Sequence, residues 1–348
     1  MSQRPGRWPE KRRGWLTAVL GAAAVLAATS VTLSPAAAQD TRYFRIGTGS
    51  TGGTYFPVGA LLANIISNPP GSRECDKGGS CGVPGLIAVA QSTSGSVDNA
   101  RAIGDRALES GLVQMDIAYW AYLGAGISPP IGPFTNIRVI ANLYPEAMQV
   151  VVRADGGIDG IGALRGKRVS LGQEGSGTLV NSLAILGAYG LTPADVAPSY
   201  LALGQAADAL RNGELDAFFQ VAGAPADAVA ELAESTDIAL LPIDGEVATK
   251  LLERYKFFTA SEIGPDTYKG VARTPTLSVG AVWAADLGVD EDLVYGITKA
   301  LWHPSSRTLL DNGHPIGRLI RVESALDGIA VPLHPGAARY YDELGLRG

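Results

Sequence analysis

Three short stretches combine glycine with hydroxyl residues, and each directly precedes a segment with a helical pattern. They are Gly49-Ser50-Thr51-Gly52-Gly53-Thr54, Ser92-Thr93-Ser94-Gly95-Ser96 and Gly175-Ser176-Gly177-Thr178. Glycine lets the backbone approach a ligand closely. The first N–H groups of a helix, together with its dipole, attract a carboxylate or phosphate without a cationic side chain. Serine and threonine also occur as plain helix caps, but three such loops at strand ends favour an anion-binding cleft.

The first loop also contains a G-x-G-x-x-G pattern, from Gly47 to Gly52, after a short apolar run. In a dinucleotide-binding unit, an acidic residue about 20 positions further on holds the ribose. Glu74 and Asp76 lie near that distance, but they sit among turn residues beside a cysteine. The pattern therefore favours another anion over a nucleotide, and we expect no cofactor.

Catalytic motifs are missing from the sequence. Ser176 has glycine on both sides but does not fit the G-x-S-x-G pattern, and there is no H-E-x-x-H. We therefore expect neither a catalytic residue nor a metal ligand, and a protein that is not an enzyme. A hydrolase or transferase using the same cleft stays as an alternative, because scattered carboxylates can pair in space.

Strand-like and helix-like segments alternate along the chain, which predicts an α/β fold with a largely parallel sheet. The loops described above fall between a strand and the helix after it. The expected strands are 43–47, 86–91, 137–142, 148–153, 217–221, 238–242 and 277–283, and the expected helices are 55–66, 97–110, 178–189, 203–211, 226–235 and 291–301.

The first 38 residues have the pattern of a secretory signal peptide. Five basic residues precede the uncharged apolar run 14–28, and Ala36-Ala37-Ala38 offers a cleavage site. The pair Arg12-Arg13 leaves the choice between general and twin-arginine export open. No later apolar run approaches the roughly 20 residues that cross a bilayer. We expect a periplasmic protein without a membrane span in its mature chain.

Charge and cysteine content narrow the possible partners. Removing residues 1–38 leaves 23 Lys and Arg against 33 Asp and Glu, so the mature chain is acidic and a poor nucleic-acid binder. Cys75 and Cys81 are the two cysteines, and an exported chain favours a disulfide between them. Metal binding is the weaker interpretation, because the three histidines, His303, His314 and His334, are all far along the chain.

Taken together, these stretches resemble the TAXI-type (TRAP-associated extracytoplasmic) solute-binding proteins of TRAP transporters. The resemblance covers nearly all of the mature chain and rests on RIGTGSTGGTYFPVGALLANII, STSGSVDNARAIGDRALESGLVQMDIAYWAY, EGSGT and VPLHPGAARYYDELG, with NGELDAFF and VYGITKALW between them. It implies a two-lobed type II periplasmic-binding fold. It also implies capture of a small organic anion, a dicarboxylate or an amino acid such as glutamate, for delivery to the membrane subunits of a TRAP transporter.

The resemblance carries ligand-binding roles to matching positions. These positions are Gly49, Ser50, Thr51, Gly52, Gly53, Thr54 and Tyr55 in the first loop, Ser94 and Gly95 in the second, Gln114, then Ser176, Gly177 and Thr178 in the third, and Gly223. Asp116, two residues after Gln114, suits a structural role equally well. The insert that carries both cysteines departs from the family pattern, and it would alter specificity if it bordered the cleft.

We expect one lobe from residues 39–145 plus 270–348 and the other from 146–269, joined by hinge crossovers. A ligand that contacts both lobes favours their closed state, because only the closed state offers both sets of contacts. The protein is expected to act as a monomer. An exported sensor subunit that reports to a signalling partner is the alternative to a transport receptor.

Overall fold

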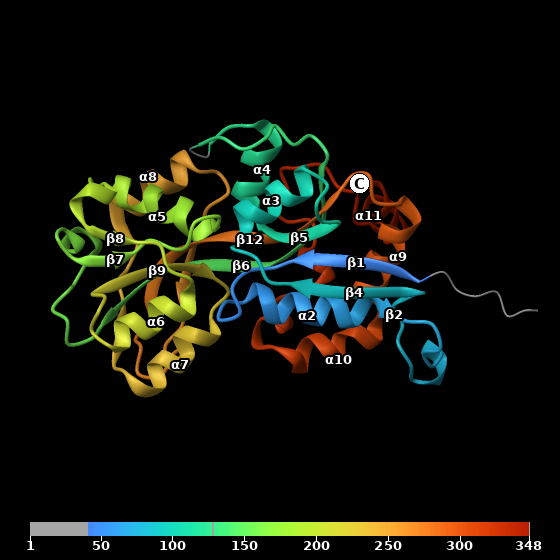
Figure 1. The fold of residues 1–348 in the computed structure, drawn as a ribbon, viewed down its shortest axis with the longest axis horizontal. Coiled ribbons are helices and arrows are strands. Elements are labelled where there is room, and N and C mark those ends of the chain that lie inside the picture. Colours follow the sequence, from blue (N-terminus) through green and yellow to red (C-terminus); the bar gives the residue numbers. More distant parts are fainter. Residues whose placement is uncertain (1–40, 127–128, 348) are drawn as a thin grey trace, which may run out of the picture. The chain divides into compact units, whose positions relative to one another are not determined.

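The computed structural model describes residues 41–126 and 129–347 (Figure 1). The expected signal peptide lies outside the described residues. Within the described part of the chain, no helix is both long and apolar enough to cross a membrane.

The fold is built on one sheet with both parallel and antiparallel strands. Its main path runs β4-β1-β5-β12-β6-β9-β7-β8, with β10 added on β6 and β11 on β12. A separate pair joins β2 (Ser67–Asn68) to β3 (Val83–Pro84). The strands of the main sheet are β1 (Arg42–Gly47), β4 (Leu86–Gln91), β5 (Ser110–Gln114), β6 (Ile137–Arg153), β7 (Arg168–Ser170), β8 (Ala197–Ser199), β9 (Ala217–Ala222), β10 (Ile238–Leu240), β11 (Thr259–Ile263) and β12 (Thr274–Asp286).

The expectation of a largely parallel sheet is wrong. Strands β1, β4 and β5 are parallel to one another, as are β7, β8 and β9. Between these groups, β6 and β12 pair antiparallel with each other and with the neighbouring strands. The sheet therefore consists of two parallel groups joined by an antiparallel centre.

Strand β6 is one continuous element of 17 residues, where the sequence predicts two short strands. Pro145 and Glu146 suggest a break, since a proline cannot donate a ladder hydrogen bond and a glutamate is unusual in a buried strand. Both residues nevertheless pair with β12, Pro145 opposite Gly280 and Glu146 opposite Val279. The long pairing keeps this stretch extended and carries it from one parallel group to the other.

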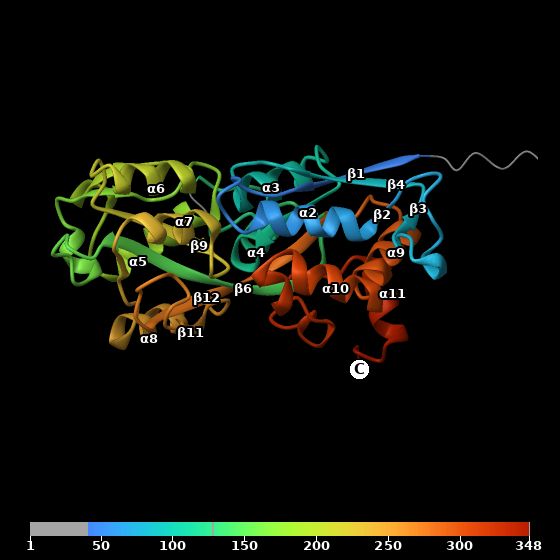
Figure 2. The ribbon, with the colours of Figure 1, turned by 90° about the horizontal axis from the view of Figure 1, so that it is seen from below.

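Helices cover both faces of the sheet (Figures 1 and 2). Helices α5 to α8 lie around β7, β8 and β9, whereas α2 to α4 and α9 to α11 lie around β1, β4 and β5 (Figure 1). The helices are α2 (Tyr55–Ile66), α3 (Ser96–Gly104), α4 (Met115–Leu123), α5 (Gly177–Ala188), α6 (Leu203–Arg211), α7 (Asp227–Ser235), α8 (Gly245–Arg254), α9 (Glu291–Leu301), α10 (Pro304–Gly313) and α11 (Pro335–Glu343).

Helix α3 ends six residues before the predicted end at residue 110. Arg106 has a left-handed backbone with a φ of 59°, and the Ala107 amide turns back to the Ala102 carbonyl at 2.7 Å. Leu108 is buried although it lies outside the helix. The apolar spacing that suggests a longer helix therefore belongs to a buried turn that leads into β5.

Strand β6 contributes to all three hydrophobic cores of the described residues, and β12 contributes to two of them. Trp283 of β12 is fully buried and meets Phe44 of β1 edge-on, with ring centroids 6.4 Å apart. On β6, Val151 packs with α6 and α7, whereas Leu143 packs with α2 and α9. Because residues of β6 enter each of these cores, the strand links the packing at the two ends of the sheet.

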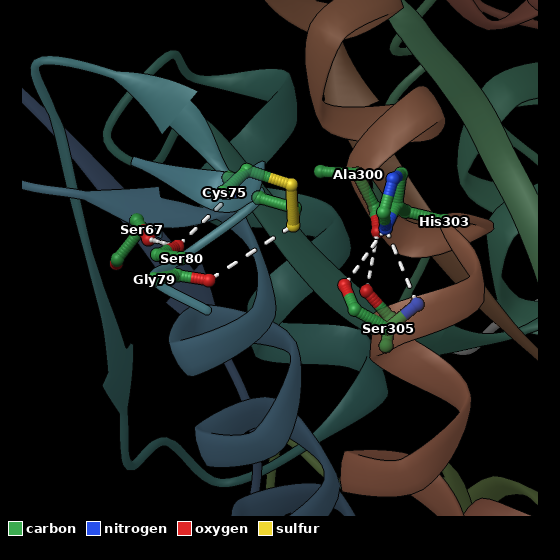
Figure 3. Close-up of a disulfide and its surroundings, with 10 residues drawn as sticks. Ser67, Cys75, Gly79, Ser80, Ala300, His303 and Ser305 are labelled. Atoms are coloured by element: carbon green, nitrogen blue, oxygen red, sulfur yellow. Dashed lines mark hydrogen bonds between the residues drawn. A yellow bond between two sulfur atoms is a disulfide. The ribbon is translucent and has the colours of Figure 1, made fainter. Parts of the chain in front are cut away.

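The predicted disulfide is present. Cys75 and Cys81 are joined across a Cα–Cα distance of 4.7 Å, beside a short 3₁₀ turn at Cys75–Lys77. The expectation that no histidine lies near the cysteines is wrong, because the fold brings His303 next to this disulfide (Figure 3). The sulfur atoms are bonded to each other, so neither is a thiolate that could bind a metal. His303 itself accepts a hydrogen bond from the Ser305 amide at 3.2 Å and so caps the N-terminus of α10.

Replacing both cysteines (Cys75→Ser with Cys81→Ser) should lower the free energy of unfolding by about 2 kcal/mol, because a crosslink over so short a loop removes little chain entropy from the unfolded state. Equilibrium denaturation by urea measures the change. The reduced wild-type protein serves as the control and should match the double variant. An unchanged unfolding midpoint in both would contradict the prediction.

Candidate functional site

The three glycine-and-hydroxyl loops meet at one cavity of about 60 Å³. The first loop connects β1 to α2, the second connects β4 to α3, and the third connects β7 to α5. Of the predicted site residues, those that line the cavity are Gly49, Ser50, Gly53, Thr54, Tyr55, Ser94, Gly95, Gln114, Ser176, Gly177 and Thr178. The fold thus brings loops from both parallel groups of the sheet to the same place.

Three predicted residues do not line the cavity. Thr51 is exposed to solvent. The carbonyl of Gly52 accepts a hydrogen bond from the Ala228 amide at 3.1 Å, and the amide of Gly223 donates to Thr54 Oγ1 at 3.2 Å. Gly52 and Gly223 therefore hold loops from the two ends of the sheet together. The cysteine-bearing insert, residues 71–88, is absent from the residues that line the cavity.

The helix starts differ in what they can offer a ligand. At α3, the amides of Val97 and Asp98 both donate to the Gly175 carbonyl at 3.0 Å, so the third loop already occupies them. At α5, Ser176 Oγ caps the Leu179 amide at 3.1 Å, while the amides of Gly177 and Thr178 have no acceptor within the described residues. The start of α5 is therefore the best-placed donor group for a carboxylate.

Glu146 lines the cavity, although sequence reasoning did not select it. Its side chain is on β6 and the residue is only 2% exposed. The Tyr55 hydroxyl donates to its carboxylate oxygen at 2.8 Å. Burial raises the pKa of Glu146 to about 8, the Tyr55 hydrogen bond opposes this rise, and the negative charge of Asp116 adds to it. The carboxyl group is therefore mostly protonated at neutral pH.

Gln114 lies at the end of β5 and is 1% exposed. Its amide oxygen is buried without a hydrogen-bond partner in the described residues. A Cβ atom at position 177 would lie 1.7 Å from this oxygen, so the close approach of Gln114 requires glycine there. The predicted pair of Gln114 and Gly177 thus forms one wall of the cavity.

Asp116 is fully buried but does not line the cavity. It accepts hydrogen bonds from the Asn181 side chain and from the Ile117 amide, each at 2.8 Å. Burial raises the pKa of Asp116 to about 6, and these two hydrogen bonds oppose the rise. Its contacts join α4 to α5, which agrees with a structural role.

The described lining of the cavity contains one acidic side chain, Glu146, and no Lys, Arg or His. A bound carboxylate would therefore depend on backbone amides and hydroxyl groups. Leu201, Leu203 and Val221 supply apolar surface to the cavity. The arrangement can bind and orient a small polar molecule.

The fold of this chain is one that known structures share. The chain has the α/β fold of two-lobed periplasmic binding proteins. It is similar to the periplasmic binding protein BugD, with 12% identity, a TM-score of 0.52, and 88% of this chain and 95% of that one covered. It is also similar to a periplasmic transporter structure, with 16% identity, a TM-score of 0.51, and 87% and 94% covered. The aliphatic sulphonate binding protein SsuA from Escherichia coli matches at 15% identity and a TM-score of 0.40, with 86% and 78% covered.

The sequence also matches a known protein family. Residues 46–345 match the NMT1-like family, and the chain belongs to it.

Replacing Glu146 with glutamine should make the protein's stability less sensitive to pH. The pKa of Glu146 is higher in the folded state, at about 8, than the ordinary value of 4.5 expected in the unfolded state. The folded protein thus binds more protons in this range, so the stabilisation is complete below pH 4.5 and is lost as pH rises towards 8. Between pH 4.5 and pH 8, the free energy of unfolding of the variant should therefore rise relative to that of wild type, by up to about 1.4 kcal/mol per pH unit.

Urea unfolding of both proteins at intervals from pH 5 to pH 8 measures this difference. Glu109→Gln is the matched control, because Glu109 lies outside the cavity and pairs with Arg45 at 2.7 Å. Parallel stability curves for wild type and Glu146→Gln would show that Glu146 is ionised in the folded protein throughout the range.

Proposed function

We propose that this protein is a periplasmic solute-binding receptor that captures a small organic anion, a dicarboxylate or an amino acid, and delivers it to a TRAP-type secondary transporter. The observation that carries the proposal is the meeting of three glycine-and-hydroxyl loops at one cavity. The unoccupied amides at the start of α5 would hold the ligand's carboxylate. Export is supported by the sequence of the first 38 residues, and the transporter class by the TAXI resemblance.

The proposal includes two lobes, 39–145 plus 270–348 and 146–269, that close around the ligand. Hydrogen bonds between their loops support a closed arrangement of the two proposed lobes. The Gln173 side chain donates to the Ser94 carbonyl at 2.7 Å, and His314 Nε2 lies 3.3 Å from Asp227 Oδ1. Together with the bond from the Ala228 amide to the Gly52 carbonyl, these contacts cross between the proposed lobes. A ligand that adds contacts to both lobes would shift the population further towards this arrangement.

A thermal-shift screen of small carboxylic acids and amino acids tests the receptor function. We expect stabilisation by one chemical class at a 1:1 ratio, confirmed by calorimetry, with no product detected by mass spectrometry. A ligand present at 100 times its Kd should add about 2.7 kcal/mol to the free energy of unfolding. Turnover of the ligand would instead make the protein an enzyme.

Replacing Thr178 with valine should weaken ligand binding by about tenfold, because it removes a hydroxyl that lines the cavity and hydrogen-bonds the Val221 amide at 3.1 Å. Isothermal titration calorimetry with the screened ligand measures the change.

The matched control is Thr298→Val. Thr298 is also fully buried and hydrogen-bonded to backbone, donating to Val294 at 2.7 Å, but it lies on α9 away from the cavity. Both variants should lose stability, and only Thr178→Val should lose affinity. If the two variants bind the ligand with equal affinity, the third loop is not part of the binding site.

A further inference from the structure

The disulfide and His303 form a cluster of side chains that can bind metals, away from the cavity (Figure 3). The two sulfur atoms and one imidazole nitrogen all lie within 4.8 Å of one another. Around one tetrahedral Zn²⁺, with Zn–S bonds of about 2.3 Å and Zn–N bonds of about 2.0 Å, such ligand atoms are about 3.5–4 Å apart. The three side chains are therefore close enough to bind one ion once the sulfur atoms are no longer bonded to each other.

We propose that reduction of the disulfide converts Cys75, Cys81 and His303 into a three-ligand site for Zn²⁺. Thiolate and imidazole are ligands that Zn²⁺ prefers, and a site with three protein ligands leaves the fourth position for water. The insert that carries the cysteines is absent from the lining of the cavity. The zinc site is thus separate from the proposed receptor site and does not depend on it.

The loop between the cysteines has hydrogen bonds that do not involve the sulfur atoms. The Glu74 carbonyl accepts from the Lys77 amide at 3.1 Å and from the Gly79 amide at 2.9 Å. The Ser80 hydroxyl donates to the carbonyl of Ser67, which ties the loop to the end of α2 (Figure 3). Reduction of the disulfide breaks none of these bonds, so the two thiols stay beside His303.

His303 lies between α9 and α10, and its ring is already oriented by Ser305. Its Nδ1 accepts from the Ser305 amide at 3.2 Å and lies 2.7 Å from Ser305 Oγ. Its Nε2 has no hydrogen-bond partner within the described residues and is the nitrogen left for a metal. With Nε2 on the ion, Nδ1 carries the ring proton and donates it to Ser305 Oγ, as the outer nitrogen of a metal-binding histidine usually does.

The reductant that opens the site is a dithiol, and the disulfide is accessible to it because Cys75 is exposed and Cys81 is half-buried. A thiolate of the dithiol attacks Cys75 Sγ, the bond between the cysteines breaks, and Cys81 leaves as a thiolate. The second thiol of the reductant then displaces Cys75 and forms a cyclic disulfide. The two cysteines gain two electrons and two protons, and Zn²⁺ replaces both protons when it binds.

The test measures Zn²⁺ binding to the oxidised and the reduced mature protein by isothermal titration calorimetry. A phosphine reduces the protein and is removed before the titration, because a dithiol would itself bind zinc. We expect the reduced protein to bind one Zn²⁺ and to release about two protons, seen as a dependence of the heat on the buffer. The oxidised protein has no thiolate and should bind Zn²⁺ at least about 100-fold more weakly.

His303→Asn separates the role of the imidazole as a ligand from its role as a helix cap, because asparagine also caps helices. The variant should bind Zn²⁺ at least about 100-fold more weakly in the reduced state, since loss of an outer-shell partner alone costs about 10–100-fold. The matched control is His334→Asn. His334 also precedes a proline and caps a helix, accepting from the Gly336 amide at 3.3 Å, but it lies outside the cluster. This variant should keep the wild-type affinity for Zn²⁺.

Three results would overturn the inference. One is Zn²⁺ binding that is as tight in the oxidised protein as in the reduced protein, and another is unchanged affinity in reduced His303→Asn. The third is a reduced protein that binds no Zn²⁺, whether or not circular dichroism shows it to be folded, because the site requires the loop to keep its shape without the crosslink.

Discussion

A carboxyl group held 2% exposed in a cavity lined by no basic side chain is the constraint around which this site is organised. Moving an isolated charge out of water costs more than one hydrogen bond returns, so the group takes up a proton instead. The Tyr55 hydroxyl fixes the orientation of Glu146, and it also lies 3.2 Å from the hydroxyl of Ser96, the first residue of α3. Tyr55 thus connects Glu146 to the first two loops of the site.

Strands β6 and β12 make this placement possible. A glutamate in a short surface strand would turn to solvent, whereas position 146 is opposite Val279 in the middle of a long antiparallel pair. The same two strands carry the chain between the parallel groups whose loops line the cavity. Strand β6 therefore supplies both a link between the two parallel groups and the acidic side chain, Glu146, at their junction.

Sequence reasoning found the loops because their signals are local. Glycine and serine before a helical pattern indicate a loop that can approach a ligand closely and cap the helix, whatever the position of that helix in the fold. Gly53, Ser94 and Ser176 could therefore be selected without knowing the fold. The α/β class followed from the alternation of patterns in the same way. The antiparallel centre could not be predicted, because the apolar patterns of residues 137–142 and 148–153 fit a parallel and an antiparallel strand equally well.

Glu146 and His303 show which features could not be predicted from the sequence alone. Glutamate after proline is typical of a turn, and only pairing with a strand more than a hundred residues later buries it. His303 lies more than two hundred positions from the disulfide that it adjoins in space. In both cases, the chemistry of the residue depends on distant neighbours that no spacing rule specifies. Gln114 was selected from the resemblance, but its unpartnered oxygen became visible only in three dimensions.

The backbone bonds between the loops have a consequence for the receptor function proposed above. Gly175 accepts from α3, and Gly52 accepts from the Ala228 amide, through main-chain groups that do not depend on any side chain. In that proposal, these bonds would favour the closed arrangement with or without a ligand. A transporter that recognised only the closed shape would then bind the ligand-free receptor as well. It would need a second signal that differs between the two forms, such as a difference in charge.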